Sequence, residues 1–285
     1  MIGVPVGGVA VFQPGWCESL LFCVRAHKIA QNHRVAVPSP GLLFRIVIAM
    51  QNTYIKKLLE SGSLRSFARW LVIGVVLLWS LAAITLVAAR WIDPPTTAVH
   101  IERRFQAWIH QTSKNAPYRE RYKFVPLNQI SDDLQHAVIA AEDAHFYQHH
   151  GFDWHEIQIA AEEDLEGERT RGASTITQQL VKNLFFGTGR SILRKGAEAT
   201  LVPVAELVLG KERILEIYLN VVEWGPGIYG AESACRYYDE IAALNISRQQ
   251  AARLAAILPA PLKRRPERMN NYSAIILKRM SQMGW

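Results

Sequence analysis

Residues 172–183 read GASTITQQLVKN, and this stretch determines how the rest of the chain is interpreted. Ile176, Leu180 and Leu184 recur at the spacing that lines one face of a helix. Ser174 stands where an N-cap is expected, and the remaining positions carry mainly hydroxyl, amide and ammonium groups. We therefore expect an amphipathic helix that starts near Ser174 and directs its N-terminal amides toward an anionic ligand.

The quoted stretch lies inside a longer segment of one charge sign. Residues 169–197 contain six basic residues and no acidic residue, whereas residues 153–168 contain seven acidic residues and no Lys or Arg. The bases are Arg169, Arg171, Lys182, Arg190, Arg194 and Lys195. We interpret the acidic run as a solvated helix face. The basic run could be one too, but its interleaved Ser, Thr, Gln and Asn residues suit a phosphorylated, polyhydroxylated ligand.

A second polar cluster lies upstream, where residues 140–151 read AAEDAHFYQHHG. Glu142 and Asp143 end a predicted apolar helix that starts after the N-cap Ser131. His145 and His149 have the spacing of two metal ligands on a helix, but the HExxH pattern is not complete. Spacing alone therefore indicates an acid/base site near a basic pocket.

The rest of the chain also shows the hydrophobic spacing of helices. Further helices are predicted from about Ser191, from 211 to 222, and from Ser247, where Gln250 completes a capping box. Because no segment alternates convincingly with period two, the predicted fold class is all-α.

Residues 70–89 form an uncharged apolar run of the length that crosses a bilayer. Trp70 and Trp91 stand at its ends, where aromatic rings favour the interface. The preceding segment is more basic than acidic, which predicts a cytoplasmic N-terminus and places everything after Arg90 outside. The sequence thus predicts a single-pass membrane protein.

The net charge of +7 has a local origin. Residues 1–90 hold nine basic and two acidic residues, and the rest is balanced. A basic segment beside an apolar run indicates a membrane surface, and no nucleic-acid-binding motif is present. The three cysteines, Cys17, Cys23 and Cys235, support neither a disulfide framework nor a zinc site. We interpret Cys235 as a small buried hydrophobe.

The chain divides into five predicted segments. Residues 1–49 are rich in Gly, Val and Pro and precede a credible start at Met50, so we interpret them as a dispensable extension. The others are a cytoplasmic stub (50–69), the transmembrane helix (70–90), a linker and membrane-proximal segment (91–126) and the catalytic domain (127–285).

Five blocks of sequence, in order, resemble those of the family 51 glycosyltransferases, specifically the monofunctional biosynthetic peptidoglycan transglycosylases. They are Glu142-Asp143-x-x-Phe146-x-x-His149-x-Gly151, the stretch 172–183, Arg194-Lys195-x-x-Glu198, Arg213-Ile214-Leu215-Glu216-x-Tyr218-Leu219-Asn220, and Gly227-x-x-Gly230-x-x-x-Ala234. The resemblance covers nearly half of the chain. It implies a lysozyme-like helical fold with a small membrane-apposed lobe. It also implies a location in the bacterial inner membrane, with the catalytic domain in the periplasm.

The resemblance also implies a reaction. Lipid II is polymerised into β-1,4-linked glycan strands by inversion, and undecaprenyl pyrophosphate is the leaving group. Glu142 would be the general base at the acceptor hydroxyl, and Lys182, Arg190, Arg194 and Lys195 would bind the pyrophosphate. Glu198 would act either through a divalent cation, Mg²⁺ or Mn²⁺, or by orienting the basic residues. No tightly bound cofactor is expected.

Other motif residues are expected to shape the site. Cleft residues would be Asp143, Ser174, Thr175, Gln178, Gln179 and Asn183, and Phe146, His149 and Gly151 would complete the first motif. The expected partners are lipid II, the growing lipid-linked strand, the membrane, and other cell-wall synthesis and division proteins. No nucleic acid is expected.

One position departs from the family. Ile159 stands roughly where relatives often have a basic residue, so Arg169 or Arg171 could supply that charge. No SxxK with its partner motifs follows, so we expect polymerisation without cross-linking. Two alternatives are a glycan-cleaving muramidase or lytic transglycosylase, which needs no pyrophosphate pocket, and a non-catalytic scaffold, which needs neither glutamate.

Overall fold

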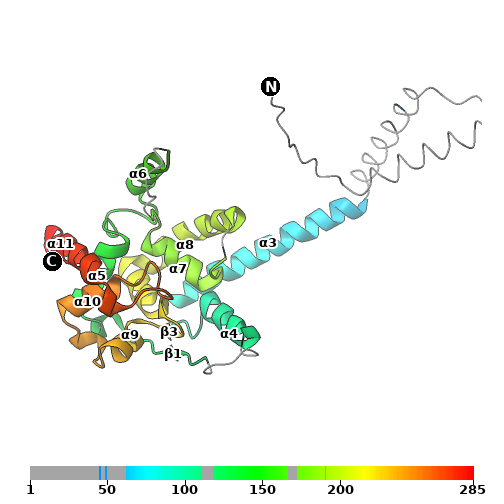
Figure 1. Cartoon of the computed structure of the whole chain (residues 1–285). Coiled ribbons are helices and arrows are strands. Elements are labelled where there is room, and N and C mark those ends of the chain that lie inside the picture. The colour runs from blue at the N-terminus through cyan, green and yellow to red at the C-terminus, as the bar shows by residue number, and fades with distance from the viewer. Residues whose placement is uncertain (1–44, 46–48, 50–61, 111–117, 166–171, 190) are drawn as a thin grey trace, which may run out of the picture. The chain divides into compact units, whose positions relative to one another are not determined.

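The structure, a computed structural model, describes residues 45, 49, 62–110, 118–165, 172–189 and 191–285. Several predictions therefore fall outside the described residues. They concern residues 1–49, of which only 45 and 49 are described, the start at Met50, and the basic residues Arg169, Arg171 and Arg190. The chain forms two compact units, Met1–Ile73 and Gly74–Trp285. The second unit is mostly helical, which confirms the predicted all-α class (Figure 1).

The helices are α3 (Gly62–Ala89), α4 (Ala98–His110), α5 (Asp132–Glu142), α6 (Trp154–Leu165), α7 (Ile176–Phe185), α8 (Ile192–Val221), α9 (Ala231–Tyr238), α10 (Arg248–Ala255) and α11 (Asn270–Gln282). Short 3-10 helices are η1 (Leu127–Gln129), η2 (Ala243–Asn245) and η3 (Pro266–Arg268).

Helix α3 contains the predicted membrane span. Its segment Arg65–Ala89 is long and apolar enough to cross a membrane. Only 6% of the most apolar window of that segment is buried, whereas the core helix of a soluble protein would be mostly buried. The helix is therefore consistent with a single-pass anchor.

The last turns of α3 belong to the core of the second unit. Leu86 and Ala89 are buried there. The indole Nε1 of Trp79 donates to Thr200 Oγ1 at 3.0 Å, and Arg90 Nη1 donates to the Val208 carbonyl at 2.9 Å. The predicted transmembrane segment thus has a second role, because its end packs against α8.

Helix α8 consists of two helical parts that meet at Gly210. The backbone of Gly210 has φ +74° and ψ 164°, which is not helical. An L-residue adopts this positive φ only with strain, so glycine suits the break. The prediction of one helix starting near Ser191 and another starting at residue 211 is confirmed.

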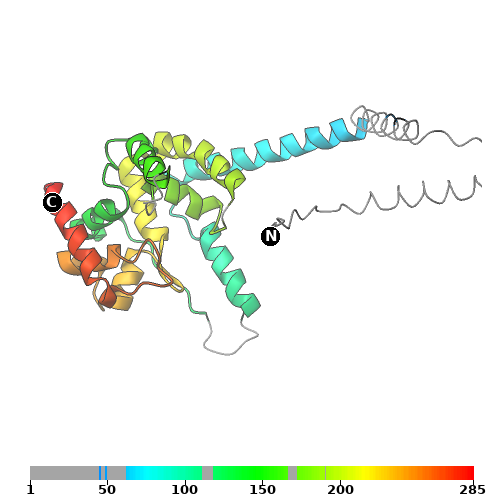
Figure 2. The same ribbon diagram turned by 45° about the horizontal axis from the view of Figure 1, so that its top comes forward.

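Helices α5, α10 and α11 pack against one another (Figure 1), and α7 packs along α8 (Figure 2). The predicted capping box of Ser247 and Gln250 is present at α10. Ser131 occupies the N-cap position of α5, but its side chain makes no capping hydrogen bond. Cys235 is fully buried in the core, as predicted.

A small sheet was not predicted. Its strands are β1 (Arg121–Tyr122), β2 (Glu223–Gly225) and β3 (Ile228–Tyr229), in the order β1-β3-β2. Strand β1 runs parallel to β3, and β2 runs antiparallel to it. Strands of two or three residues are too short to produce a period-two pattern, so no alternation in the sequence indicated them.

The segment interpreted as a linker, 91–126, also contributes to the folded unit. Val99, His100 and Val125 are buried, and His100 Nε2 lies 3.2 Å from the Val221 carbonyl oxygen. Burial lowers the pKa of His100, against the opposing effect of that backbone contact. Helix α4 and strand β1 are therefore structural parts of the domain.

Candidate active site

Glu142 is the last residue of α5, and the backbone leaves the helical conformation at Asp143. The carboxylate oxygen Oε2 of Glu142 accepts a hydrogen bond of 2.7 Å from Gln179 Nε2 on α7. The other oxygen, Oε1, is buried and has no hydrogen-bond partner among the described residues. Glu142 thus has one oxygen held by Gln179 and one buried oxygen without a hydrogen-bond partner in the described part of the chain.

The surroundings of Glu142 change its acidity. Burial raises the pKa of the Glu142 carboxyl above its usual value. The hydrogen bond from Gln179 and the charges of Lys182 and Arg264 oppose this rise, and Asp143 adds to it. A carboxylate with a raised pKa is a stronger base, which suits proton abstraction near neutral pH.

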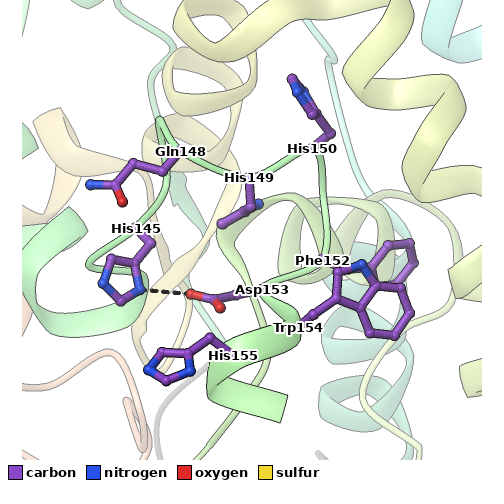
Figure 3. A pocket seen from close by; sticks show the side chains of 8 residues that line it. All are labelled: His145, Gln148, His149, His150, Phe152, Asp153, Trp154 and His155. Atoms are coloured by element: carbon purple, nitrogen blue, oxygen red, sulfur yellow. Dashed lines mark hydrogen bonds and ion pairs between the residues drawn. The ribbon is translucent and has the colours of Figure 1, made fainter. Parts of the chain in front are cut away.

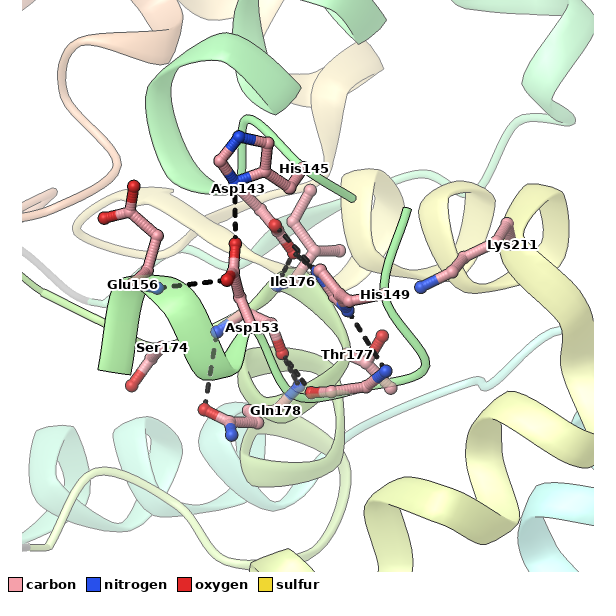
Figure 4. A network of polar contacts seen from close by, with 12 residues as sticks. Asp143, His145, His149, Asp153, Glu156, Ser174, Ile176, Thr177, Gln178 and Lys211 are labelled. Atoms are coloured by element: carbon pink, nitrogen blue, oxygen red, sulfur yellow. Dashed lines mark hydrogen bonds and ion pairs between the residues drawn. The ribbon is translucent and has the colours of Figure 1, made fainter. Parts of the chain in front are cut away.

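Asp143 makes its contacts with other residues. Its carboxylate lies 2.9 and 3.1 Å from His149 Nε2, and it accepts a 2.9 Å hydrogen bond from the Ile176 backbone N–H at the start of α7 (Figure 4). His149 Nδ1 accepts from the Gly151 N–H at 3.1 Å, which leaves Nε2 to donate to Asp143. Asp143 and His149 therefore connect the end of α5 to the start of α7.

The start of α7 differs by one residue from the prediction. Thr175, not Ser174, is the N-cap, and it forms a capping box with Gln178. The Thr175 hydroxyl also donates to the Gly151 carbonyl at 2.7 Å. The prediction of Ser174 as the cap was wrong because both neighbours are good capping residues, and the contact with Gly151 selects Thr175.

The basic residues gather around Glu198, which is only 2% exposed on α8. Arg194 Nε lies 3.1 Å from its Oε1, and Lys195 Nζ lies 3.8 Å from its Oε2. Lys195 also donates to Ser174 Oγ and Gln178 Oε1, both at 3.4 Å.

Lys182 belongs to the same cluster. Burial lowers the pKa of Lys182, and the opposing charge of Glu198 is the next largest influence on it. Arg194, Glu142 and Lys195 also act on the pKa of Lys182. Three of the four predicted cations therefore share one site, with Lys182 influenced by both glutamates.

Two further motif residues are buried. Phe146 is fully buried, and Lys211 Nζ lies 4.5 Å from the centre of its ring. Asn183 is 6% exposed on α7.

A loop contact that the sequence did not suggest supports Arg194. Arg194 Nη1 donates to the Gly187 carbonyl at 3.0 Å. The next residue, Thr188, donates from its backbone N and its hydroxyl to the two carboxylate oxygens of Glu102 on α4, each at 2.5 Å. Helix α4 thus holds the loop that holds Arg194. Glu102 lies outside the five motifs, so sequence reasoning had no basis for selecting it.

A cavity of about 420 Å³ lies beside this site and is rich in histidine (Figure 3). Its lining residues are His145, Gln148, His149, His150, Phe152, Asp153, Trp154 and His155. His145 Nδ1 lies 2.8 Å from Asp153 Oδ2, whereas His149 contacts Asp143. The two histidines that suggested a metal pair therefore contact different carboxylates. No group of three or more potential ligands occurs in the described part of the chain.

Two residues act on the surroundings of Glu142 in ways that the sequence did not indicate. Tyr218 belongs to the fourth block, and its hydroxyl donates to Gln179 Oε1 at 2.9 Å. Arg264, which lies outside the five blocks, contributes a charge that acts on the pKa of Glu142. Arg264 lies more than 100 positions from Glu142, and no local pattern reports such a tertiary approach.

The comparisons with known proteins agree with this geometry. The family model described as Transglycosylase matches residues 108–281. A biosynthetic peptidoglycan transglycosylase of Pseudomonas putida strain W619 is 45% identical over 231 residues, which cover 79% of this chain and 93% of that protein.

Two more relatives carry the same description. The protein from Pseudomonas entomophila is 46% identical over 215 residues, 73% of this chain and 89% of the relative. The one from Pseudomonas aeruginosa PAO1 is 45% identical over 214 residues, 73% of this chain and 90% of the relative. The matches identify a peptidoglycan glycosyltransferase with a lysozyme-like catalytic domain. The chain belongs to the family 51 glycosyltransferases, in the group of monofunctional biosynthetic peptidoglycan transglycosylases.

Proposed function

We propose that this enzyme polymerises lipid II into β-1,4-linked glycan strands and releases undecaprenyl pyrophosphate. The observation that carries the proposal is the pairing of a buried, partly free carboxyl with a cluster of cations. Glu142 Oε1 has no partner among the described residues, and the nearby Lys182 responds to the charges of both Glu142 and Glu198. A base and a pyrophosphate-binding group are the two parts that this transfer requires.

Glu142 acts as the general base. Its carboxylate takes the proton of the acceptor's N-acetylglucosamine 4-hydroxyl, whose oxygen forms the new bond to the anomeric carbon of the donor. The bond from that carbon to the pyrophosphate oxygen breaks, and its electron pair leaves with the pyrophosphate. One displacement converts the α-linked donor into a β-linked product.

The cations stabilise the departing charge. Lys182, Arg194 and Lys195 lie around Glu198, on α7 and the first part of α8. Arginine can bind phosphate oxygens in a bidentate manner, and lysine acts as a point charge. A muramidase or lytic transglycosylase needs no such group, so the cluster favours the synthetic reaction.

Glu198 orients these cations. Its carboxylate has Arg194 and Lys195 within 4 Å, and its charge acts on Lys182. Three cations around one carboxylate disfavour a divalent cation at the same group. The structure therefore supports the orienting role over the metal-binding role.

The membrane anchor places the site near its lipid-linked substrate. Trp79 lies within the apolar run of α3, and Arg90 directly follows that helix. Both donate hydrogen bonds to α8, the helix that carries Glu198. The basic excess before the span gives a cytoplasmic N-terminus and a periplasmic catalytic domain. Tethering raises the concentration of the enzyme's site at a substrate confined to the bilayer.

The test is incubation of the purified full chain with labelled lipid II, with and without penicillin. We expect polymer that lysozyme digests, in equal amounts in both samples and without cross-links. Glu142→Gln should lower the rate by about 10²–10⁴-fold. Near-normal turnover by this variant would remove Glu142 from the mechanism, and glycan cleavage without polymer would favour the lytic alternative.

A further inference from the structure

Three side chains from three helices form one hydrogen-bonded chain that ends at the proposed base. The Tyr218 hydroxyl on α8 donates to Gln179 Oε1 at 2.9 Å. The other end of the same carboxamide, Gln179 Nε2 on α7, donates to Glu142 Oε2 at 2.7 Å. Tyr218 is fully buried. The proposed function uses Glu142 but assigns no role to Tyr218.

The direction of this chain follows from chemistry. An ionised carboxylate can only accept hydrogen bonds, so the NH₂ end of Gln179 must face Glu142. Burial, and then the charges of Glu142 and Asp143, raise the pKa of the Tyr218 hydroxyl well above its usual value. The phenol therefore keeps its proton and donates a hydrogen bond to the carboxamide oxygen. Both ends favour the same orientation of the amide.

We propose that Tyr218 is a positioning residue that holds the Gln179 carboxamide with its NH₂ group toward Glu142 and thereby favours the carboxylate form of the base. The inference rests on the proposed function, because it assigns a partner to the same base. It concerns how that base is kept ready to accept a proton, and not whether Glu142 is the base.

Loss of the hydroxyl should act on the protonation of Glu142. In Tyr218→Phe the oxygen of Gln179 loses its buried donor, so the amide can turn around. A protonated Glu142 could then donate to Gln179 Oε1, which stabilises the uncharged acid. The charges that act on Glu142, those of Lys182, Arg264 and Asp143, are still present in this variant. The pKa of Glu142 should therefore rise further.

The experiment measures kcat/KM for lipid II polymerisation as a function of pH, because its acidic limb reports the essential base of the free enzyme. Tyr218→Phe should move this limb to higher pH by about half a unit to one unit, the size expected for one hydrogen bond. Its activity should fall more at pH 6 than at pH 8.

Tyr229→Phe is the matched control. Tyr229 is also a fully buried tyrosine, and its hydroxyl lies 2.9 Å from that of Tyr118. Removal of this hydroxyl should lower the melting temperature without moving the acidic limb. If Tyr218→Phe also lowered only the melting temperature, its role would be structural and the proposal would be wrong.

Gln179→Met covers the case in which Tyr218→Phe does not fold. Gln179→Met removes the hydrogen bond that stabilises the Glu142 carboxylate, so it must also move the limb upward. An unmoved limb in Gln179→Met overturns the proposal. Failure of the proposed function and failure of the role of Tyr218 can be told apart. An active Glu142→Gln refutes Glu142 as the base. An inactive Glu142→Gln, with unmoved acidic limbs in Tyr218→Phe and Gln179→Met, refutes only the role of Tyr218.

Discussion

Arg194 and Glu198 lie one turn apart on α8, with 3.1 Å between Arg194 Nε and Glu198 Oε1. These two atoms do not meet hydrogen-bond geometry, so the contact is an ion pair only. Arg194 also donates to the Gly187 carbonyl. Glu198 and the loop thus hold the guanidinium from two sides.

Neutralising the cation cluster should impair polymerisation. We expect Lys182→Ala or Arg194→Ala to lower kcat/KM by ten-fold or more, on the order of 1.4 kcal/mol in transition-state stabilisation. Both variants should also bind moenomycin, a phosphoglycolipid inhibitor of the family, less tightly. The measurements are polymerisation of labelled lipid II and inhibitor titration.

Arg236→Ala is the appropriate control for these variants. Arg236 pairs with Glu232 on α9, is largely exposed, and is not among the charges that act on Glu142 or Lys182. Its loss should change stability by roughly 0.5 kcal/mol or less and leave the rate near that of the unmodified enzyme. Equal losses in cluster and control variants would contradict the pyrophosphate assignment.

Much of the fold could be predicted because its signals are local. Long helices with one apolar face and the uncharged run of α3 are visible in the sequence, as is the break at Gly210. The sheet was missed because its strands are too short. The packing of Leu86 and Ala89 into the core was also missed, since a residue that faces protein and one that faces lipid are equally apolar.

The sequence allowed site residues to be proposed only where they belong to a motif. The motifs named Glu142, Glu198 and the three described cations, and their roles stay predictions. In the structure Arg194 and Lys195 lie beside Glu198, and the charges of both glutamates act on the pKa of Lys182. The motifs did not name Glu102 and Arg264, because their relation to the site depends on tertiary contacts between distant segments. Gln179 was identified, but its bond to Tyr218 requires the approach of α7 to α8.

The buried end of α3 predicts a stability effect. Leu86→Ala should lower the free energy of unfolding by about 2–5 kcal/mol, since Leu86 is fully buried in the core. Leu81→Ala on the same helix is the control, because Leu81 is 61% exposed, and it should change stability by roughly 0.5 kcal/mol or less. Denaturant unfolding in detergent measures both.

The same contacts limit where the anchor can be removed. Deletion of residues 1–92 should leave a helical domain with lower activity on membranes. However, it removes Leu86, Ala89 and the Ala89 carbonyl that accepts from Arg213 at 2.9 Å. A protein that starts at Gly74, the beginning of the second unit, should melt at a higher temperature than the protein that lacks residues 1–92. Equal melting temperatures would show that α3 adds nothing to the core.

Gly151 should not tolerate a side chain. Its φ is +96°, and an added Cβ would lie 2.4 Å from Val202 Cγ1. Gly151→Ala should therefore cost at least about 1–3 kcal/mol and disturb the adjacent His149. Gly196→Ala, a helical position with no atom near the added Cβ, should instead stabilise by about 0.5–1 kcal/mol. Thermal melts of both variants compare the two effects, and a stable Gly151→Ala would contradict the packing described here.

Arg264 should tune the base by its charge. The positive charge of Arg264 lowers the pKa of Glu142, which burial raises. In Arg264→Ala the pKa should rise further, so the carboxylate form is lost at a higher pH as the solution is acidified. The loss of kcat/KM should be roughly two-fold or more greater at pH 6 than at pH 8.

The neighbouring Lys263 supplies the comparison. Lys263 is exposed and is not among the charges that act on Glu142. Lys263→Ala removes the same formal charge one residue away, so a general effect of net charge on binding to an anionic membrane should appear equally in both variants. A shift of the acidic limb in Arg264→Ala alone would assign the effect to Glu142. Equal profiles in the two variants would mean that Arg264 acts on membrane binding and not on the base.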